Sequence, residues 1–513
     1  MLSAFQNETF VDFTNERDAA VMREAIANVE SQFGREYPVI IGGKRYTTGD
    51  MLASVNPSNY EEVIGLVHKA SIELADKAIE SATDAFQQWK NVAPEVRARY
   101  LLKVASLLRK HKPEFTALIV MEVGKSWAEA DGDVAETIDF AEFYAREMIR
   151  YSREQPLTPL AGEQNELIYI PLGVGVVIPP WNFPLAILAG MTLASVVAGN
   201  TVVLKPSSES PVVSARFVEL LEEASLPPGV VNFVPGSGAK IGDYLVGNPR
   251  TRFIAFTGSK EVGLHINELA AKTAEGQLWI KRVVSEMGGK DTIVVDETAD
   301  LDWAVARLAY GAFAYAGQVC ISVQRIYVVA SIYEEFERRF VERVQQVKVG
   351  SPLDPDTDLG PMVDGKAVER TDEWVREALS RGARALTGGQ PNGRFYPPTV
   401  LVDVPKDARV CGEEVFAPVV NLFPVPDFAA AVRELNDSQF GLQCGVFTND
   451  LERTLTAHDE LEVGGVIVND VPTWRIDPMP YGGVKDSGLG REGLRWSIED
   501  MTEPRLLAFA RPI

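Results

Sequence analysis

The chain has 513 residues, of which 46% are hydrophobic and 24% are charged. This balance is ordinary for a globular protein and excludes a disordered or fibrous chain. At about 150 residues per domain, the length predicts two to four domains. The 50 Lys and Arg residues against 72 Asp and Glu residues give a formal net charge of −22. Because such an acidic field repels phosphates and anionic lipid, we expect no nucleic-acid partner and no membrane association.

The cysteine and histidine content argues against disulfides and metal sites. Cys320, Cys411 and Cys444 stand at wide and irregular spacing, unlike a disulfide framework or a zinc site. None of the four histidines is spaced to share a metal ion with a cysteine or another histidine, so we predict no bound metal. Free thiols, and an acidic N-terminus without an apolar core, favour a cytoplasmic protein.

The first 151 residues are predicted to be mainly helical. Apolar periodicity predicts a helix over residues 16–33, a hairpin over 37–48, a turn at 56–59 and helices over most of 72–151. Residues 167–204 then carry no charge, a length that could span a membrane. Because four prolines interrupt this stretch, we interpret it instead as the buried interior of an α/β domain.

From residue 174 onward, short apolar strands alternate with helices, which is typical of βαβ units and a parallel sheet. A second series of the same kind follows Glu286, so we predict two α/β domains. The first series has strands at 174–178, 201–204, 230–234 and 253–256 and helices at 185–198, 211–224, 240–246 and 261–274. The second has strands at 291–296, 325–330, 419–425 and 464–470 and helices at 302–316 and 332–347.

Glycines at the ends of predicted strands suggest a phosphate-binding cleft. The usual GxGxxG fingerprint follows no predicted strand, and a literal match at 488–493 lies too near the C-terminus to open a βαβ unit. Instead, Lys205 ends one strand, glycines at 236–238 follow the next, and the segment 258–263 opens a helix. Such glycines let phosphates approach backbone N–H groups, although a turn can also require glycine for its conformation alone.

Three side chains have a context that suits catalysis. Cys320 follows a Gly-Gln break, where a thiol of lowered pKa is a nucleophile, although a free cysteine is more often a small buried hydrophobe. Glu286 lies between apolar segments and is either a buried base or a solvated turn residue. Asn182, in a proline-bounded turn, either caps the next helix or donates a hydrogen bond to an oxyanion.

The motifs PWNFP, LKPSSESP, FTGSKEVG, EMGGKD, GQVC, EEVFAPVV and MPYGGVKDSGLGREG occur in this order and resemble the aldehyde dehydrogenase superfamily over nearly the whole chain. The resemblance implies NAD(P)-dependent oxidation of an aldehyde to a carboxylic acid. It also implies an α/β fold with a Rossmann-like cofactor domain, an α/β catalytic domain and a small β oligomerisation arm. We expect the cofactor domain at 1–151 and 171–285, the catalytic domain at 286–485, and the arm with the C-terminal tail at 152–170 and 486–513.

Matched motif by motif, the resemblance implies that Cys320 is the nucleophile, that Asn182 and the Cys320 N–H bind the oxyanion, and that Glu286 activates water. The implied cofactor contacts are Pro180, Trp181, Lys205, Ser208, Gly238, Phe256, Thr257, Gly258, Ser259, Gly263, Glu414 and Phe416. The implied substrate contacts are Phe183, Ile321 and Arg475.

The branch of the superfamily determines the substrate. The first ~300 residues resemble 1-pyrroline-5-carboxylate dehydrogenases, which oxidise glutamate 5-semialdehyde in proline breakdown, through segments such as ETIDFAEFYAREM and KRVVSEMGGKD. Those enzymes usually read GQKCS, whereas here Val319 precedes Cys320 and Ile321 follows it. The late segment NDVPTWRIDPMPYGGVKDSG resembles lactaldehyde and succinate-semialdehyde branches. We predict glutamate 5-semialdehyde as substrate, with a broad-range or lactaldehyde/succinate-semialdehyde enzyme as the alternative.

The same residues bear on the choice of cofactor and on other possible functions. NAD-selective relatives often place a Glu three residues after the lysine, whereas this chain has Ser208 there, so both NAD and NADP are candidates. A cysteine acyl-transferase would need a histidine partner, a CoA-acylating enzyme typically lacks the residue equivalent to Glu286, and a non-catalytic binding protein would be expected to lose a catalytic residue. We therefore predict an enzyme that acts on a small-molecule aldehyde, as a homo-oligomer whose arms pair as strands across subunits.

Overall fold

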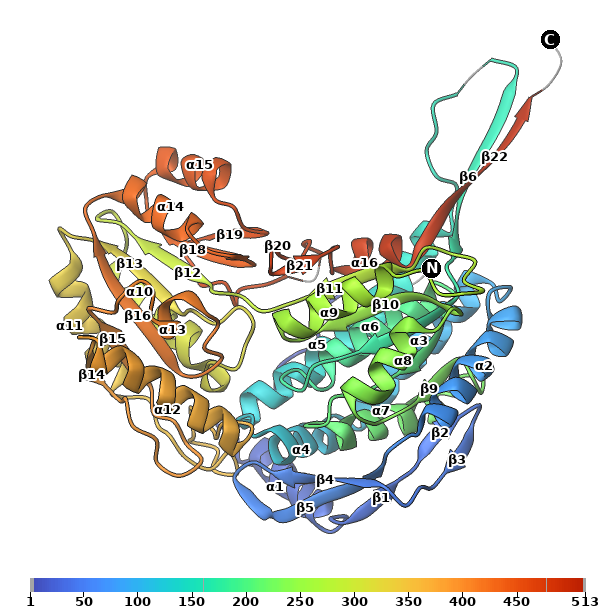
Figure 1. Cartoon of the computed structure of the whole chain (residues 1–513), viewed down its shortest axis with the longest axis horizontal. Coiled ribbons are helices and arrows are strands. Elements are labelled where there is room, and N and C mark those ends of the chain that lie inside the picture. The colour runs from blue at the N-terminus through green and yellow to red at the C-terminus, as the bar shows by residue number, and fades with distance from the viewer. Residues whose placement is uncertain (1–3, 160, 477, 511–513) are drawn as a thin grey trace.

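The computed structural model describes residues 4–159, 161–476 and 478–510. Two α/β bodies lie side by side, and a narrow arm projects from the body that contains the N-terminal half (Figure 1). In the described ranges, no helix is both long and apolar enough to cross a membrane. From residue 172 onward, the charge-free stretch instead runs through strands and a helix whose side chains are mostly buried.

The N-terminal part is helical, as its apolar periodicity predicted, with a small sheet and the predicted hairpin. Serines cap two of its helices: the Ser71 Oγ accepts from the Leu74 N–H at 3.3 Å, and Ser126 forms a capping box with Glu129. Its elements are α1 (Glu16–Glu30), β1 (Arg35–Tyr37), β2 (Val39–Ile41), β3 (Lys44–Tyr46), β4 (Met51–Asn56), β5 (Asn59–His68), α2 (Ile72–Trp89), α3 (Pro94–Lys110), α4 (Lys112–Val123) and α5 (Trp127–Tyr151).

The sheet of this first body is completed by the alternating series that follows. Its further elements are β7 (Val174–Ile178), α6 (Ala186–Val197), β8 (Thr201–Leu204), α7 (Pro211–Glu223), β9 (Val231–Phe233), the π-helical turn η1 (Gly238–Gly242), α8 (Asp243–Gly247), β10 (Thr251–Thr257), α9 (Lys260–Ala271), β11 (Arg282–Glu286) and β21 (Gly488–Leu489). The strand order is β21-β11-β10-β7-β8-β9-β2-β3. The five neighbouring strands β11, β10, β7, β8 and β9 run parallel. The chain order reverses between β7 and β10, the position where open α/β sheets bind ligands.

The second body contains a seven-stranded sheet in the order β14-β15-β16-β13-β12-β18-β19, parallel except for β14. The predicted second α/β domain is therefore present. Its elements are β12 (Thr292–Val295), α10 (Leu301–Phe313), the 3-10 turn η2 (Ala314–Gly317), β13 (Arg325–Val329), α11 (Tyr333–Val344), α12 (Gly365–Ser380), β14 (Arg384–Thr387), β15 (Thr399–Val402), α13 (Arg409–Gly412), β16 (Val419–Val425), α14 (Phe428–Asn436), β17 (Phe440–Gly441), β18 (Gln443–Phe447), α15 (Leu451–Glu460), β19 (Gly465–Val468) and β20 (Val484–Lys485).

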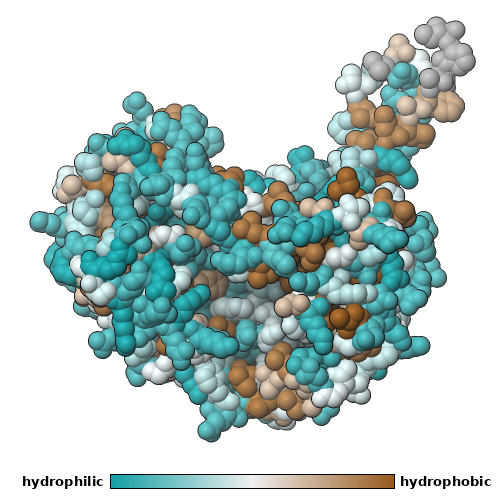
Figure 2. All heavy atoms as spheres, in the orientation of Figure 1, coloured by the Kyte–Doolittle hydropathy of each residue, from teal (hydrophilic) through white to brown (hydrophobic). Residues whose placement is uncertain are grey.

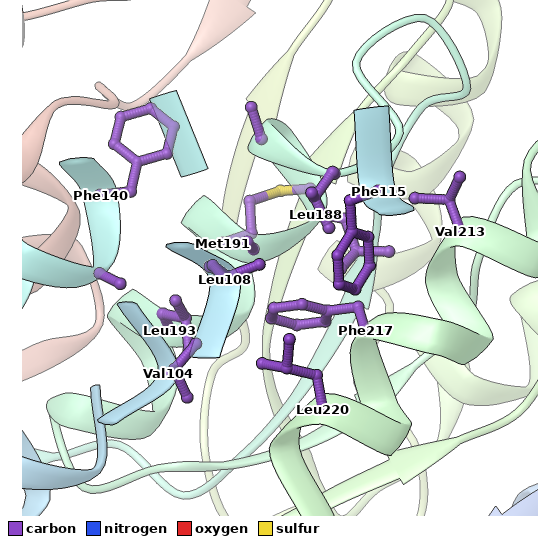
Figure 3. Packing of buried hydrophobic residues seen from close by; sticks show 14 of the residues in the cluster. Val104, Leu108, Phe115, Phe140, Leu188, Met191, Leu193, Val213, Phe217 and Leu220 are labelled. Carbon is purple, nitrogen blue, oxygen red and sulfur yellow. The ribbon is translucent and has the colours of Figure 1, made fainter. Parts of the chain in front are cut away.

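The core of the first body holds its helices against the parallel sheet. Leu108 of α3, Met191 of α6 and Phe217 of α7 meet between their helices, and Phe140 of α5 lies beside α6 (Figure 3). Each of these four side chains is at most 5% exposed. Burying a large apolar side chain stabilises the fold by about 1.5–3 kcal/mol, so this packing keeps the strand ends in place for the site described below.

The arm is a two-stranded antiparallel ribbon of β6 (Glu163–Pro171) and β22 (Thr502–Ala510). We expected these segments to pair across subunits, but here they pair with each other within one chain. Any pairing between subunits would therefore use the outer edges of the ribbon.

Residues 486–501, which we grouped with the arm and tail, instead return to the first body: β21 pairs with β11, and α16 (Leu494–Asp500) packs against α5 and α6.

Candidate active site

A cleft of about 970 Å³ lies between the two bodies and is seen as a hollow in the space-filling view (Figure 2). The first body lines it with the segments that follow β7, β8, β9, β10 and β11. These are the carboxyl ends of the parallel strands, on both sides of the reversal in strand order. The second body closes the cleft with segments 363–374 and 413–416.

Eleven of the twelve predicted cofactor contacts line this cleft: Pro180, Trp181, Lys205, Ser208, Gly238, Phe256, Thr257, Gly258, Ser259, Glu414 and Phe416. Gly263 does not line it. A Cβ at Gly263 would lie 2.4 Å from the Met287 Sδ. The missing side chain therefore lets α9 pack against the segment after β11, which is a structural reason for this glycine and not a ligand contact.

The chemistry of the cleft suits a dinucleotide. Helix α9 begins in the cleft, where Ser259 caps it by accepting a hydrogen bond from the Val262 N–H, and the N-terminus of a helix attracts phosphate. Lys205 lies at the end of β8 and is 6% exposed. Burial lowers its pKa to about 8. Its Nζ donates to the neighbouring Pro206 carbonyl at 3.0 Å, and its other N–H groups can reach a ribose hydroxyl.

The position three residues after Lys205 carries no negative charge. Ser208 is exposed on the wall of the cleft, and the adjacent acidic residue is Glu209. Burial, followed by the charge of Asp364, raises the pKa of Glu209. Lys366 of α12 also lines this part of the cleft. At the Ser208 position a phosphate on the adenosine ribose would meet a hydroxyl, while the carboxylate of Glu209 lines the cleft one residue further along the chain.

The loop that carries Cys320 starts with an unusual backbone turn. The helix predicted over 302–316 ends earlier, at Phe313, and Tyr315, Ala316 and Gly317 follow with φ angles of 48°, 53° and 66°. Left-handed backbone is uncommon for Tyr and Ala and concentrates at functional sites. The buried Gln318 then anchors the loop, because its Oε1 accepts from the Val363 N–H at 2.8 Å.

Cys320 lies on the wall of the cleft and is partly exposed, whereas Cys411 and Cys444 are buried. Burial raises the pKa of the Cys320 thiol to about 12, and a hydrogen bond with Tyr481 acts to lower it. The Sγ atom of Cys320 is 3.1 Å from the Tyr481 Oη. Of the three thiols, Cys320 is thus the one that a ligand in the cleft can reach.

Asn182 lies beside the Cys320 loop. It occupies the turn between β7 and α6, is 5% exposed and lines the same cleft. Its Nδ2 donates to the Gln318 carbonyl at 3.0 Å, two residues before Cys320. The side-chain amide is therefore held next to the thiol by the loop that presents it.

Glu286 is the last residue of β11 and is 2% exposed. Neither of its carboxylate oxygens has a well-aligned hydrogen-bond partner among the described residues. Burial, followed by the charge of Glu492, raises its pKa well above the ordinary value. Gly482, with φ 149°, lies so close that a Cβ there would be 2.6 Å from the Glu286 Oε1. An unpaired buried carboxylate is costly, which points to a functional reason for this one.

The three predicted substrate contacts lie outside the cleft. Phe183 and Ile321 pack against the core of the first body. The guanidinium of Arg475 lies 4.7 Å from the ring centroid of Tyr481, and its Nη1 is 3.5 Å from the Glu136 Oε1 on α5. Arg475 and Cys320 therefore contact the same tyrosine, Arg475 over its ring and Cys320 at its hydroxyl.

Sequence reasoning missed several residues of this site, among them Tyr481, Glu492, Gln318 and the wall at 363–374. Tyr481 and Glu492 belong to the MPYGGVKDSGLGREG motif, which was the available signal for them. Their backbones pair as a bridge, with the Tyr481 N–H donating to the Glu492 carbonyl at 3.0 Å. The wall at 363–374 had no strand-end signal, because it reaches the cleft from the other body.

Comparison with known proteins adds an independent finding. A family model described as "Aldehyde dehydrogenase family" matches residues 45–507. A 1-pyrroline-5-carboxylate dehydrogenase of Geobacillus sp. (strain WCH70) is 46% identical over 492 residues, which cover 95% of each chain. This similarity therefore extends well beyond the first 300 residues.

Solved structures agree on the fold. A 1-pyrroline-5-carboxylate dehydrogenase from Thermus with bound NAD superposes with a TM-score of 0.96, at 42% identity and over 99% of each chain. Aldehyde dehydrogenase 21 from Physcomitrella patens, in complex with the reaction product succinate, has a TM-score of 0.87 at 35% identity, over 93% of this chain and 98% of the other. The predicted fold of cofactor domain, catalytic domain and arm is confirmed.

Proposed function

Because this chain belongs to the aldehyde dehydrogenase family, we propose that Cys320, Asn182 and Glu286 catalyse the NAD(P)-dependent oxidation of an aldehyde to a carboxylic acid. One observation carries the proposal. A partly exposed thiol and a buried amide line a cleft suited to a dinucleotide, and a buried carboxylate, Glu286, lies directly before the wall residue Met287 and acts on the thiol through its charge. A nucleophile, an oxyanion donor and a base are the groups that this oxidation needs.

Acylation begins at the Cys320 sulfur. As a thiolate it attacks the aldehyde carbon, a C–S bond forms, and the carbonyl electron pair moves onto oxygen. The Asn182 amide and the Cys320 N–H donate to this oxyanion, and one such donor contributes about 3 kcal/mol to transition-state stabilisation. The nicotinamide, when bound, supplies the hydride acceptor, and Cys320 then carries a thioester.

Deacylation uses Glu286. Its carboxylate takes a proton from water while the water oxygen bonds to the thioester carbon. The tetrahedral species collapses, the C–S bond breaks, and the acid and the Cys320 thiolate are released. A carboxylate whose pKa burial has raised is a stronger base than an exposed one.

The residues that would hold the cofactor are those of the strand ends. Lys205 and Ser208 would contact the adenosine ribose, the Gly258–Ser259 turn and the start of α9 the pyrophosphate, and Glu414 with Phe416 the nicotinamide ribose and ring. The neutral Ser208 supports acceptance of both NAD and NADP. Gly263 contributes the packing of α9 and no ligand contact.

Glutamate 5-semialdehyde is the substrate that we propose, because relatives named 1-pyrroline-5-carboxylate dehydrogenase are 46% identical over 95% of the chain. Arg475 offers a cation for its carboxylate, since the Arg475 Nε is buried and has no hydrogen-bond partner among the residues that the structure describes. Glu136, 3.5 Å from Arg475, offers an anion for its ammonium group. A semialdehyde that is also an amino acid matches such an ion pair.

A second candidate is a semialdehyde that has a carboxylate and no amino group. The residues on either side of the thiol favour this candidate. Val319 and Ile321 are buried hydrophobic residues, and their side chains offer no hydrogen bond to an amino group. The structure of aldehyde dehydrogenase 21 holds succinate, its own reaction product. Succinate semialdehyde would use Arg475 but not Glu136.

Assembly and location belong to the same proposal. Leu506, Leu507 and Phe509 on the arm are each 58–59% exposed, and brown side chains are seen along the arm (Figure 2). Apolar patches of this kind support self-association, so light scattering should give a homo-oligomer, and replacing these three residues by Ser should give a smaller species. Three free cysteines support a cytoplasmic location, which fractionation of the source cells would test.

A substrate panel tests the function. NADH and NADPH formation should be measured with glutamate 5-semialdehyde, succinate semialdehyde, lactaldehyde and an aliphatic aldehyde, with and without CoA. We expect CoA-independent turnover that is fastest with a carboxylate-bearing semialdehyde. Glutamate 5-semialdehyde should be preferred by less than about 10²-fold, because the residues on either side of the thiol, Val319 and Ile321, are apolar and apolar contacts discriminate weakly. Turnover that requires CoA, or its absence with every aldehyde, would refute the proposal.

A further inference from the structure

We infer that Tyr481 is a catalytic hydrogen-bond donor to the Cys320 sulfur, which stabilises the thiolate both before attack and as it leaves the thioester. The inference rests on the proposed role of Cys320 as nucleophile. The observation behind it is the 3.1 Å contact between the Tyr481 Oη and the Cys320 Sγ.

The surroundings of Tyr481 fix its hydroxyl in this position. The side chain is 6% exposed. The backbone bridge with Glu492 holds its main chain through N–H to carbonyl bonds of 3.0 and 2.7 Å. The guanidinium of Arg475 lies over the ring, 4.7 Å from the centroid. A side chain held by its backbone and by its ring points its hydroxyl without further loss of rotamer freedom.

The direction of this hydrogen bond follows from the charges around it. Burial, and then the negative charges of Cys320 and Glu286, raise the pKa of Tyr481 well above its usual value, so the phenol keeps its proton. The acidic groups whose charges act on Cys320, which are Glu414 and the two ends of the segment 286–291, Glu286 and Asp291, all disfavour a thiolate. The protonated phenol is the donor that offsets them, and Arg475 adds a positive charge over its ring.

Both halves of the reaction use this donor. In acylation it stabilises the thiolate from which the C–S bond forms. In deacylation that bond breaks and its electron pair returns to sulfur, which again accepts from the Tyr481 O–H, while Glu286 holds the proton taken from water. No proton leaves Tyr481 in either step, so the balance of the reaction is unchanged.

The test removes the hydroxyl and keeps the ring. Tyr481→Phe preserves the stacking on Arg475, and Tyr144→Phe is a matched control, because the Tyr144 hydroxyl is also buried but donates to the Ser497 Oγ at 3.2 Å. Alkylation of Cys320 by iodoacetamide in the full chain, followed by mass spectrometry across a pH series, measures the thiolate without any turnover. Failure of the proposed function would be seen separately, as activity retained in Cys320→Ala.

We expect Tyr481→Phe to slow the alkylation of Cys320 about three- to tenfold at each pH below the thiol pKa. Loss of a hydrogen bond to a charged group raises that pKa, and the gain in nucleophilicity of the more basic thiolate offsets only part of the loss of thiolate. The kcat should fall by about tenfold with little change in KM. Tyr481→His, which restores an N–H donor, should recover reactivity. Unchanged or faster alkylation in Tyr481→Phe, or an equal effect of Tyr144→Phe, would overturn the inference.

Discussion

The two sides of the Cys320 thiol are built in different ways. On the cofactor side, strand ends and glycine turns supply the wall, together with many polar side chains such as Lys205, Ser208 and Glu414. On the other side, Arg475, Glu136 and Tyr481 come from a helix and a late loop far apart in the sequence, and a few side chains make the contacts. Cofactor binding should therefore be shared among many groups, whereas substrate choice should depend on a few single residues.

The largest loss of activity is expected at Cys320 itself, the thiol that lies between the two sides. Cys320→Ala should reduce dehydrogenase activity by at least 10³-fold, because no other thiol lines the cleft among the described residues. NAD affinity, measured by calorimetry, should change little. Cys411→Ala and Cys444→Ala are matched controls that lie in the core and should affect only stability. Activity of Cys320→Ala within about tenfold of the parent would refute the nucleophile assignment.

Glu286→Gln should come next, with a fall in kcat of about 10²–10⁴-fold, the usual contribution of a general base. The raised pKa of Glu286 fixes the direction of the pH dependence. Because the carboxylate is the active form, deacylation by the parent enzyme should become faster as the pH rises through that pKa. The variant should lose this increase of the deacylation rate with pH. Stopped-flow absorbance should record a burst of one NADH per active site and then slow turnover. If the steady-state rate falls without a burst, Glu286 acts before hydride transfer.

Arg475→Ala tests the substrate side of the thiol, which Arg475, Glu136 and Tyr481 form. KM should rise by about tenfold or more for glutamate 5-semialdehyde and succinate semialdehyde, because a charge-assisted hydrogen bond is worth about 1.5–3 kcal/mol. A neutral aliphatic aldehyde should be affected little. Glu136→Gln is the matching change on α5 and should raise KM for the amino-acid substrate but not for succinate semialdehyde. Equal effects on neutral and anionic aldehydes would show that Arg475 is structural.

Ser208→Glu tests the cofactor side and should change the kinetics least. A carboxylate at this exposed position should lower kcat/KM for NADP by about tenfold, since repulsion near the surface is screened. The value for NAD should change little, and Ser207→Glu serves as a neighbouring control. An equal loss with both cofactors would place Ser208 away from the 2′ position of the adenosine ribose.

The same difference explains what the sequence could predict. The parallel sheet follows from strand periodicity, and Lys205 and the glycines next to strand ends mark part of the cofactor wall. The full set of cofactor contacts was implied by the family resemblance, and eleven of those twelve residues line one cleft. The substrate side depends on tertiary packing: nothing near Arg475 in the sequence indicates Glu136 or the stacking on Tyr481. The early end of α10 was missed for a local reason, because Tyr315 and Ala316 adopt left-handed backbone that their residue types do not favour.

The chemistry assigned to Cys320 can be observed directly in the Glu286→Gln variant. The full chain should be mixed with NAD and glutamate 5-semialdehyde, quenched in acid and digested. The masses of the three cysteine-containing peptides should then be measured by mass spectrometry. The account predicts one acyl group on the Cys320 peptide, in the same amount as the NADH burst, and unmodified Cys411 and Cys444. No acyl group on Cys320, or one on another cysteine, would contradict it.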